Sequence, residues 1–357
     1  MTGATPSSQI RRFRSLATGS AVLATTVLIP AVAGAAPPEP CTTSVCSFDV
    51  PDGQYEIRLW LGGSEAARTG INVEGRRVAL APVDTAAGRV AFRSVTVDVH
   101  TPESMPSGEE GPGTPGLQVY PTGDAPRIAR IQVVARPHVP KLFIISDSTA
   151  SDWGIGPKRG WGQALPQYFR AGIDVANYAQ SGAGTDSYLT DPRYFPRVQP
   201  MITRGDPALI QLAHNDKQTP EDVYRANLAR LVAGVRERGG APVLVTPPVR
   251  HLFGVDGRLT PTGRVVNSLG VDLPAVMRDE ARQLGVPLLD LTADSQALLE
   301  SLGEDASWSL YLTVEHDGVK DSSHFSEHGS AVIAGLVARE LAGAHLPAAH
   351  FLRHEGI

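Results

Sequence analysis

The chain is poor in cysteine and in aromatic residues, and it carries no excess of basic charge. Its 357 residues include only two cysteines, too few for a disulfide scaffold or a tetrahedral zinc site. The formal net charge is −5 and no basic stripe is present, so we expect no nucleic acid among its partners. With 42% hydrophobic, 19% charged and 6% aromatic residues, the composition indicates a globular protein and excludes a disordered tail protein, a coiled coil and a collagen.

Long apolar runs are also absent, except near the N-terminus. Three arginines within residues 11–14 precede an apolar run over residues 16–32, and the small residues 33–35 form an A-x-A cleavage signal. These features predict a secretory signal peptide over residues 1–35, using the general or the twin-arginine route. A membrane anchor is the alternative reading, but no basic cluster follows the run. We therefore expect a secreted, extracellular protein without a membrane partner, in which the two cysteines either pair or remain separate thiols.

The length predicts about two domains, and the hydrophobic pattern changes near Pro140. Between residues 41 and 138, apolar and polar residues alternate, as at Tyr55, Ile57 and Leu59, and turn signals separate the short runs. This pattern predicts a small antiparallel β-sandwich domain over residues 41–138. Residues 101–116, rich in proline, glycine, serine and glutamate, are predicted to form a long surface loop.

Beyond Pro140, short apolar runs alternate with helical stretches. One helix is predicted to begin with Thr219 as N-cap and Pro220 in the first turn. The alternation predicts an α/β domain over residues 140–346 with a parallel sheet covered on both faces, whose functional site lies at the carboxyl ends of the strands. The apolar runs assigned to strands are residues 142–145, 208–212, 243–245 and 287–291, and a further short run covers residues 174–177.

Two segments carry groups for nucleophilic catalysis. One follows a predicted strand, and the other precedes the last predicted helix. Ser148 belongs to the segment 146–149, which comes directly after the run 142–145, where a nucleophile would be presented. Asp321 precedes His324 by three residues, so the carboxylate can orient the imidazole ring. A serine hydroxyl needs a neutral imidazole to take its proton, and that imidazole needs a carboxylate to hold its tautomer. Taken alone, the Ser148 segment is better explained as a turn, and the Asp321–His324 segment is equally well explained as a helix start.

Two further segments offer donors for an oxyanion. Gly182 follows the run 174–177 and can present its backbone N–H without a side chain in the way. Asn215 follows the run 208–212 and can aim its amide at the same oxygen. Ordinary turn roles explain either residue by itself. Together, the four segments supply a nucleophile, a base with its partner and oxyanion donors, which is a complete set for acyl transfer.

The order Ser148, Gly182, Asn215, His324 resembles the four sequence blocks of the SGNH (GDSL-like) hydrolases, and in particular the rhamnogalacturonan acetylesterase family. The resemblance implies a three-layer α/β/α fold, no cofactor, no metal, and removal of acetyl groups from acetylated rhamnogalacturonan-type pectin. It also implies that Ser148 is the nucleophile, His324 the base and Asp321 its partner, with Ser148, Gly182 and Asn215 as oxyanion donors. The matching stretches are residues 145–149, 161–163, 177–182, 214–216 and 321–326.

Some features depart from the family pattern or leave alternatives open. Ser146 and Ala213 stand where the family usually has glycine, which adds bulk beside the site. Trp153 and Trp161 flank the segment after the nucleophile and are predicted to pack in the core or form a lid, or else to stack on sugar. His251 is predicted to be a solvated loop residue. The preceding sandwich resembles carbohydrate-binding modules.

The substrate is expected to be an acetylated polysaccharide or another small ester, and the protein is expected to be a monomer. The alternatives are an SGNH lipase or esterase acting on other short-chain esters, and a catalytically silent secreted carbohydrate-binding protein. The presence of Ser148, Asp321 and His324 argues against the silent protein.

Overall fold

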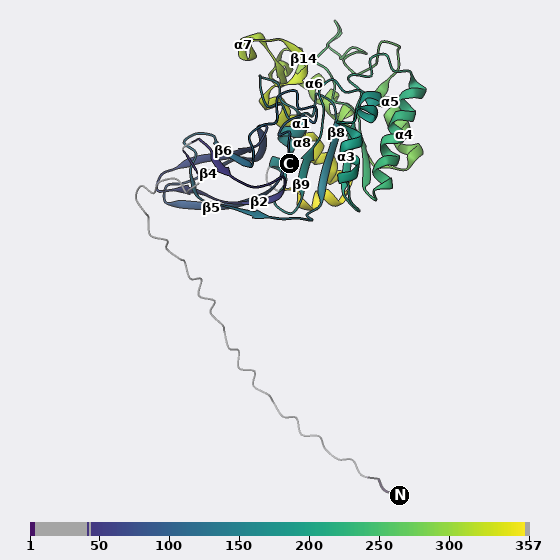
Figure 1. The fold of residues 1–357 in the computed structure, drawn as a ribbon. Coiled ribbons are helices and arrows are strands. Elements are labelled where there is room, and N and C mark those ends of the chain that lie inside the picture. The colour runs from purple at the N-terminus through teal and green to yellow at the C-terminus, as the bar shows by residue number, and fades with distance from the viewer. Residues whose placement is uncertain (4–40, 43, 354–357) are drawn as a thin grey trace.

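The computed structural model describes residues 1–3, 41–42 and 44–353, in which a β-sandwich adjoins a larger α/β region (Figure 1). The predicted signal peptide, residues 1–35, lies outside the described residues apart from residues 1–3. Within the described ranges, no helix has both the length and the apolar character needed to cross a membrane.

The N-terminal sandwich consists of two antiparallel sheets. Alternate residues of its strands point inward, among them Ile57, Leu59 and Leu61, which are fully buried. The alternation seen in the sequence therefore marks the inner faces of the sheets, and Cys41 and Cys46 form a disulfide beside them. In spatial order, one sheet contains β1 (Cys46–Phe48), β6 (Leu117–Thr122), β3 (Ala67–Val73) and β4 (Arg77–Thr85), and the other contains β5 (Arg89–Val99), β2 (Gly53–Gly63) and β7 (Ile128–Ala135).

A five-stranded parallel sheet forms the centre of the α/β region. The chain passes from β8 to β9 on one side and then crosses to β10 on the other side, so the winding direction reverses between β8 and β10. In open parallel sheets, ligands bind in the crevice at such a reversal, outside the carboxyl ends of the strands. The strand order is β12 (Leu288–Leu289), β11 (Ala241–Val245), β10 (Pro207–Gln211), β8 (Lys141–Ser146) and β9 (Asp174–Asn177).

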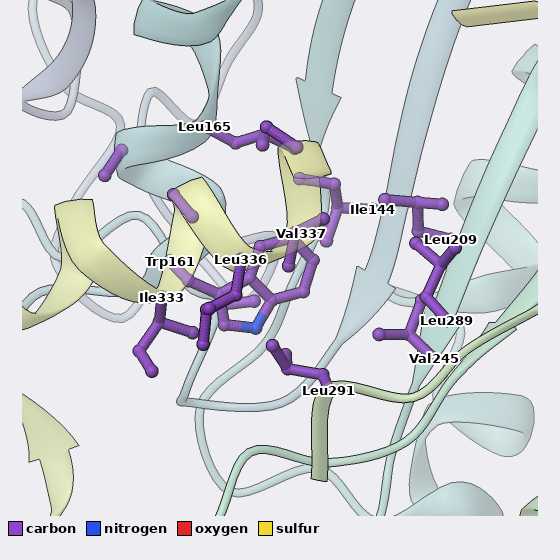
Figure 2. Close-up of a cluster of buried hydrophobic side chains, with 14 of the residues drawn as sticks. Ile144, Trp161, Leu165, Leu209, Val245, Leu289, Leu291, Ile333, Leu336 and Val337 are labelled. Carbon is purple, nitrogen blue, oxygen red and sulfur yellow. The ribbon is translucent and has the colours of Figure 1, made fainter. Parts of the chain in front are cut away.

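Helices cover both faces of this sheet, which confirms the three-layer α/β/α fold. Ile144 of β8 belongs to the hydrophobic cluster on one face, with Trp161 and Val337 (Figure 2). Its neighbour Ile145 belongs to the cluster on the opposite face. The first face is covered by α1 (Trp161–Ala164), α6 (Leu291–Ser307) and α8 (Glu327–Gly343), and the second by α2 (Thr185–Thr190), α3 (Phe195–Val198), α4 (Glu221–Glu237) and α5 (Leu273–Leu284).

Shorter elements connect these layers. A two-stranded antiparallel ribbon, β13 and β14, lies before α8 and carries the sequence Asp321–Phe325. The remaining elements are β13 (Tyr311–Leu312), β14 (Asp321–Phe325), α7 (Val314–Asp317) and the short 3₁₀ helices Leu165–Tyr168, Gln199–Met201, Trp308–Leu310 and Pro347–Phe351.

The predicted helix start at Thr219 is wrong by one residue. The helix α4 begins at Glu221 with Pro220, rather than Thr219, at the N-cap position. The hydroxyl of Thr219 donates to Asp216 Oδ1 (3.1 Å) and is thereby used in the preceding turn. The run predicted as a strand over residues 287–291 is also shorter than expected, because α6 already begins at Leu291.

The sandwich and the α/β region meet in a buried polar junction. Asp98 at the end of β5 forms an ion pair with Lys141, the first residue of β8, and accepts from the hydroxyl of Tyr178 (3.3 Å). Burial opposes the charge of Asp98, but Lys141 outweighs it and lowers the pKa of Asp98. The prediction of a surface loop over residues 101–116 is right only in part, since Ser104 and Met105 are buried in the junction.

Candidate active site

The candidate nucleophile, Ser148, lies in the turn that follows β8 and is 7% exposed. The backbone N–H of Ala150 donates to the carbonyl of Asp147 (3.1 Å) and closes this turn. Thr149 donates its backbone N–H and its hydroxyl to Asp147 Oδ1 (3.0 and 2.7 Å). These bonds hold Ser148 at the carboxyl end of a central strand.

Asp147 also joins this turn to the one after β10. Its Oδ2 accepts from Gln211 Nε2 (3.1 Å) and from the backbone N–H of His214 (3.3 Å), and lies 3.4 Å from His214 Nδ1. Burial disfavours the carboxylate, but His214 and the bonds from Thr149 prevail and lower the pKa of Asp147 to about 2. A charged, fully buried carboxylate therefore fixes the two turns on either side of the sheet's winding reversal.

Asp321 and His324 form a close pair on β14. Asp321 Oδ2 lies 2.7 Å from His324 Nδ1, and Oδ1 accepts the backbone N–H groups of Ser323 (2.8 Å) and His324 (3.1 Å). Burial raises the pKa of Asp321, but the hydrogen bonds and the nearby imidazole more than offset this and hold it well below its usual range. A carboxylate only accepts, so Nδ1 carries the proton and Nε2 is left as the basic nitrogen. The orienting role predicted for Asp321 has the geometry that it requires.

Trp153 contacts both the Ser148 turn and the His324 ring. Its indole N–H donates to the carbonyl of Ser148 (3.0 Å), and its ring meets the imidazole edge-on, with centroids 5.6 Å apart and planes at 84°. Among the described residues, no hydrogen bond joins the Ser148 hydroxyl to His324. Trp153 therefore links the backbone of the Ser148 turn to the His324 ring.

Arg250 makes a second link across the same edge. Its Nη2 donates to the carbonyl of His214 (3.0 Å), and its Nη1 donates to the hydroxyl of Ser323. Since His214 precedes Asn215 and Ser323 precedes His324, one guanidinium ties the turn after β10 to β14. The predicted base is thereby attached to the segment of a predicted oxyanion donor.

The two predicted oxyanion donors lie in adjoining turns. Gly182 has φ +78°, a left-handed conformation that favours glycine, and it is exposed with open space around its Cα. Asn215 Nδ2 donates to the carbonyl of Ala183, the residue that follows Gly182 (3.0 Å). A primary amide has two N–H groups, so one remains for a ligand. The glycine at position 182 is required by the backbone conformation and not by lack of space.

Sequence reasoning missed Gln211, the last residue of β10. Its Oε1 accepts from the hydroxyl of Ser146 (3.0 Å) and the indole N–H of Trp161 (3.0 Å), and it lies 3.0 Å from the hydroxyl oxygen of Thr149. The only signal was a polar residue inside an otherwise apolar run. This bond also explains Ser146, where the family usually has glycine, because its hydroxyl is buried and bound beneath the site.

The other candidates have structural roles. Trp161 is fully buried in the core, which confirms the predicted packing. The prediction for His251 is wrong: the residue is 2% exposed, its ring packs on Trp308 with centroids 3.9 Å apart, and its Nε2 lies 2.9 Å from the hydroxyl of Ser307. Besides the local Phe253, its aromatic neighbours Trp308 and Tyr311 come from a segment far along the chain, so the local sequence did not indicate this burial.

The parallel sheet carries a serine after a central strand and an Asp–His pair near it, which are the groups that serine hydrolases use. The model of the "GDSL-like Lipase/Acylhydrolase family" matches residues 147–332, and the chain belongs to this family. It is a serine esterase, and the resemblance to the SGNH hydrolases is confirmed.

Individual relatives agree with this assignment. The chain is 35% identical over 230 residues to the rhamnogalacturonan acetylesterase RhgT of Bacillus subtilis (strain 168), covering 60% of this chain and 96% of RhgT. It is 28% identical over 215 residues to the probable rhamnogalacturonan acetylesterase YesY of the same organism, covering 58% and 94%. The solved structure of the Bacillus subtilis protein YxiM is similar in fold, with a TM-score of 0.53 and 22% identity over 84% of this chain and 80% of YxiM.

Proposed function

We propose that this enzyme is secreted and removes acetyl groups from acetylated polysaccharide of the rhamnogalacturonan type. The observation that carries the chemistry is the 2.7 Å contact between Asp321 Oδ2 and His324 Nδ1 at the edge where Ser148 lies. The substrate class rests on the 35% identity to RhgT, and export rests on the N-terminal sequence pattern.

The reaction proceeds through an acyl-enzyme. The Ser148 hydroxyl attacks the acetyl carbonyl carbon while His324 Nε2 takes its proton, and the ester bond to the sugar oxygen then breaks. The sugar leaves as an alcohol after receiving that proton from His324. Water attacks the acetyl-serine with His324 again as base, so acetate is released and the Ser148 hydroxyl is restored. Asp321 stays ionised and stabilises the imidazolium in both halves.

The developing oxyanion is stabilised by three N–H donors. These are the backbone N–H groups of Ser148 and Gly182 and the free amide hydrogen of Asn215. Preorganised donors aimed at charge that appears in the transition state lower the barrier without reorganising.

Replacing Asn215 with alanine is expected to lower kcat by about 10²–10³-fold with little change in KM, because this donor acts on the oxyanion and not on the bound ester. Steady-state kinetics with p-nitrophenyl acetate measure both constants. A matched control is Asn267→Ala. Asn267 is, like Asn215, a half-buried asparagine, and its Nδ2 donates to the carbonyls of Asp216 and Thr219. A rise in KM with unchanged kcat would remove Asn215 from the oxyanion role.

The substrate proposal is tested by measuring acetate release from three ester classes at equal acetyl concentration: acetylated rhamnogalacturonan, acetylated xylan and glycerol acetates. We expect the highest kcat/KM on acetylated rhamnogalacturonan. Higher kcat/KM on glycerol acetates would overturn the substrate class in favour of an esterase for other short-chain esters. Retention on the polysaccharide without any acetate release would overturn the catalytic proposal.

A further inference from the structure

The turn between β3 and β4 of the sandwich holds the segment that follows the nucleophile. Arg76 donates from Nε (2.9 Å) and Nη2 (2.6 Å) to the carbonyl of Trp153, and from Nη1 (3.1 Å) to the carbonyl of Gly156. Burial lowers the pKa of Arg76 to about 10, so the guanidinium is still charged at neutral pH. One side chain from the sandwich therefore clamps two carbonyls of the loop after Ser148.

Trp153 is the residue through which this clamp reaches the site. Its carbonyl is held by Arg76 and by Gln163 Nε2 (3.0 Å), while its indole contacts the Ser148 carbonyl and the His324 ring. An aromatic ring edge-on to an imidazole restricts the positions open to that imidazole, because a displaced ring would collide with it or lose the contact. The position of Trp153 thus limits where His324 can lie.

The turn itself is tightly built. Glu74 and Arg76 have φ values of +44° and +59°, a left-handed conformation that non-glycine residues adopt only when the surroundings enforce it. Between them, the carbonyl of Gly75 accepts from Gln163 Nε2. The next residue, Arg77, lies 3.6 Å from Asp152, and both side chains are buried. The turn is thereby fixed to the α/β region by Gly75 and Arg77, the two neighbours of Arg76 in the chain.

We infer that Arg76 of the N-terminal sandwich is a positioning residue of the esterase site, which places the His324 imidazole through Trp153. The inference rests on the proposed role of His324 as the base. The sandwich then supports the active site through Trp153 without contacting the ester.

The test is a double-mutant cycle with Arg76→Ala, Trp153→Ala and the double variant, in the full mature protein with p-nitrophenyl acetate as substrate. We expect Arg76→Ala to lower kcat by about 10–100-fold with KM changed less than about two-fold, the scale expected for a small misplacement of a reacting group. The double variant should have the kcat of Trp153→Ala alone, because both changes remove the same constraint.

Two further variants separate positioning from folding. Arg76→Lys keeps the charge and can hold one carbonyl, so it should recover part of the lost kcat at an unchanged thermal midpoint. Arg68→Ala removes an exposed arginine of the same sandwich, paired with Asp84, and should leave kcat within about two-fold of the parent. Additive losses in the cycle, or a folded Arg76→Ala with kcat within two-fold of the parent, would overturn the inference. Retained turnover in Ser148→Ala would instead overturn the proposed function.

Discussion

Replacing Ser148 with alanine is expected to lower kcat for p-nitrophenyl acetate by about 10⁶-fold, as loss of a serine nucleophile does when its base and oxyanion donors remain. Alanine removes only the hydroxyl oxygen, and the turn is held by bonds to Asp147 that do not involve the Ser148 side chain. The fold should therefore survive, and residual turnover would come from water attacking an ester held by the oxyanion donors. Continuous detection of p-nitrophenol, with circular dichroism as a check of folding, measures the effect.

The matched control for this change is Ser301→Ala, an exposed serine on α6 whose hydroxyl donates to the carbonyl of Leu298. It should leave kcat unaltered. Full turnover in Ser148→Ala would exclude the acyl-enzyme mechanism. An equal loss of kcat in Ser301→Ala would show that the loss is not specific to the Ser148 hydroxyl.

Replacing Asp321 with asparagine is expected to lower kcat by about 10⁴-fold while KM changes little. The low pKa of Asp321 means that the residue is a carboxylate throughout the neutral range, so it accepts the Nδ1 proton and leaves Nε2 basic. An asparagine can turn its NH₂ group toward Nδ1, which places the proton on Nε2 and leaves the ring unable to act as a base. The amide also lacks the charge that stabilises the imidazolium.

A matched control is Glu315→Gln, an exposed acid on the nearby α7 helix. It removes the same charge at the same end of the molecule, so long-range electrostatics would affect both variants alike. The assignment of Asp321 would fail if Asp321→Asn kept kcat within about ten-fold of the parent, or if its loss were matched by Glu315→Gln.

The parts of the fold that depend on local pattern could be read from the sequence. The run 174–177 coincides with β9, and the run 208–212 differs from β10 by one residue at each end. The run 208–212 is almost wholly apolar because helices cover both faces of the sheet, whereas β9, at the edge of the sheet, begins with Asp174 and ends with Asn177. The candidate residues Ser148 and Asn215 could be found for the same reason: polar residues directly after buried strands stand out against the runs before them.

Contacts between segments that are distant in the sequence could not be predicted from local pattern. Arg76 and Trp153 lie 77 positions apart, and an arginine in a turn reads as an ordinary solvated residue. The predicted surface loop 101–116 likewise gave no sign that Ser107 would donate to Gln180 beside the oxyanion turn (2.8 Å). These bonds exist only because the sandwich docks against the α/β region, and that docking depends on the shape of two surfaces.

The ion pair between Asp98 and Lys141 bears on any attempt to shorten this enzyme. A chain trimmed to begin at Pro140 would keep Ser148, His324 and the turns that hold Gly182 and Asn215. It would lack Asp98, the ion-pair partner of Lys141 at the start of β8. In the truncated hydrolase, the Lys141 ammonium would have lost its ion-pair partner, and the surface that the sandwich covers would be exposed to solvent. For anyone producing the enzyme, the N-terminal half is best retained as an integral support rather than discarded as an accessory module.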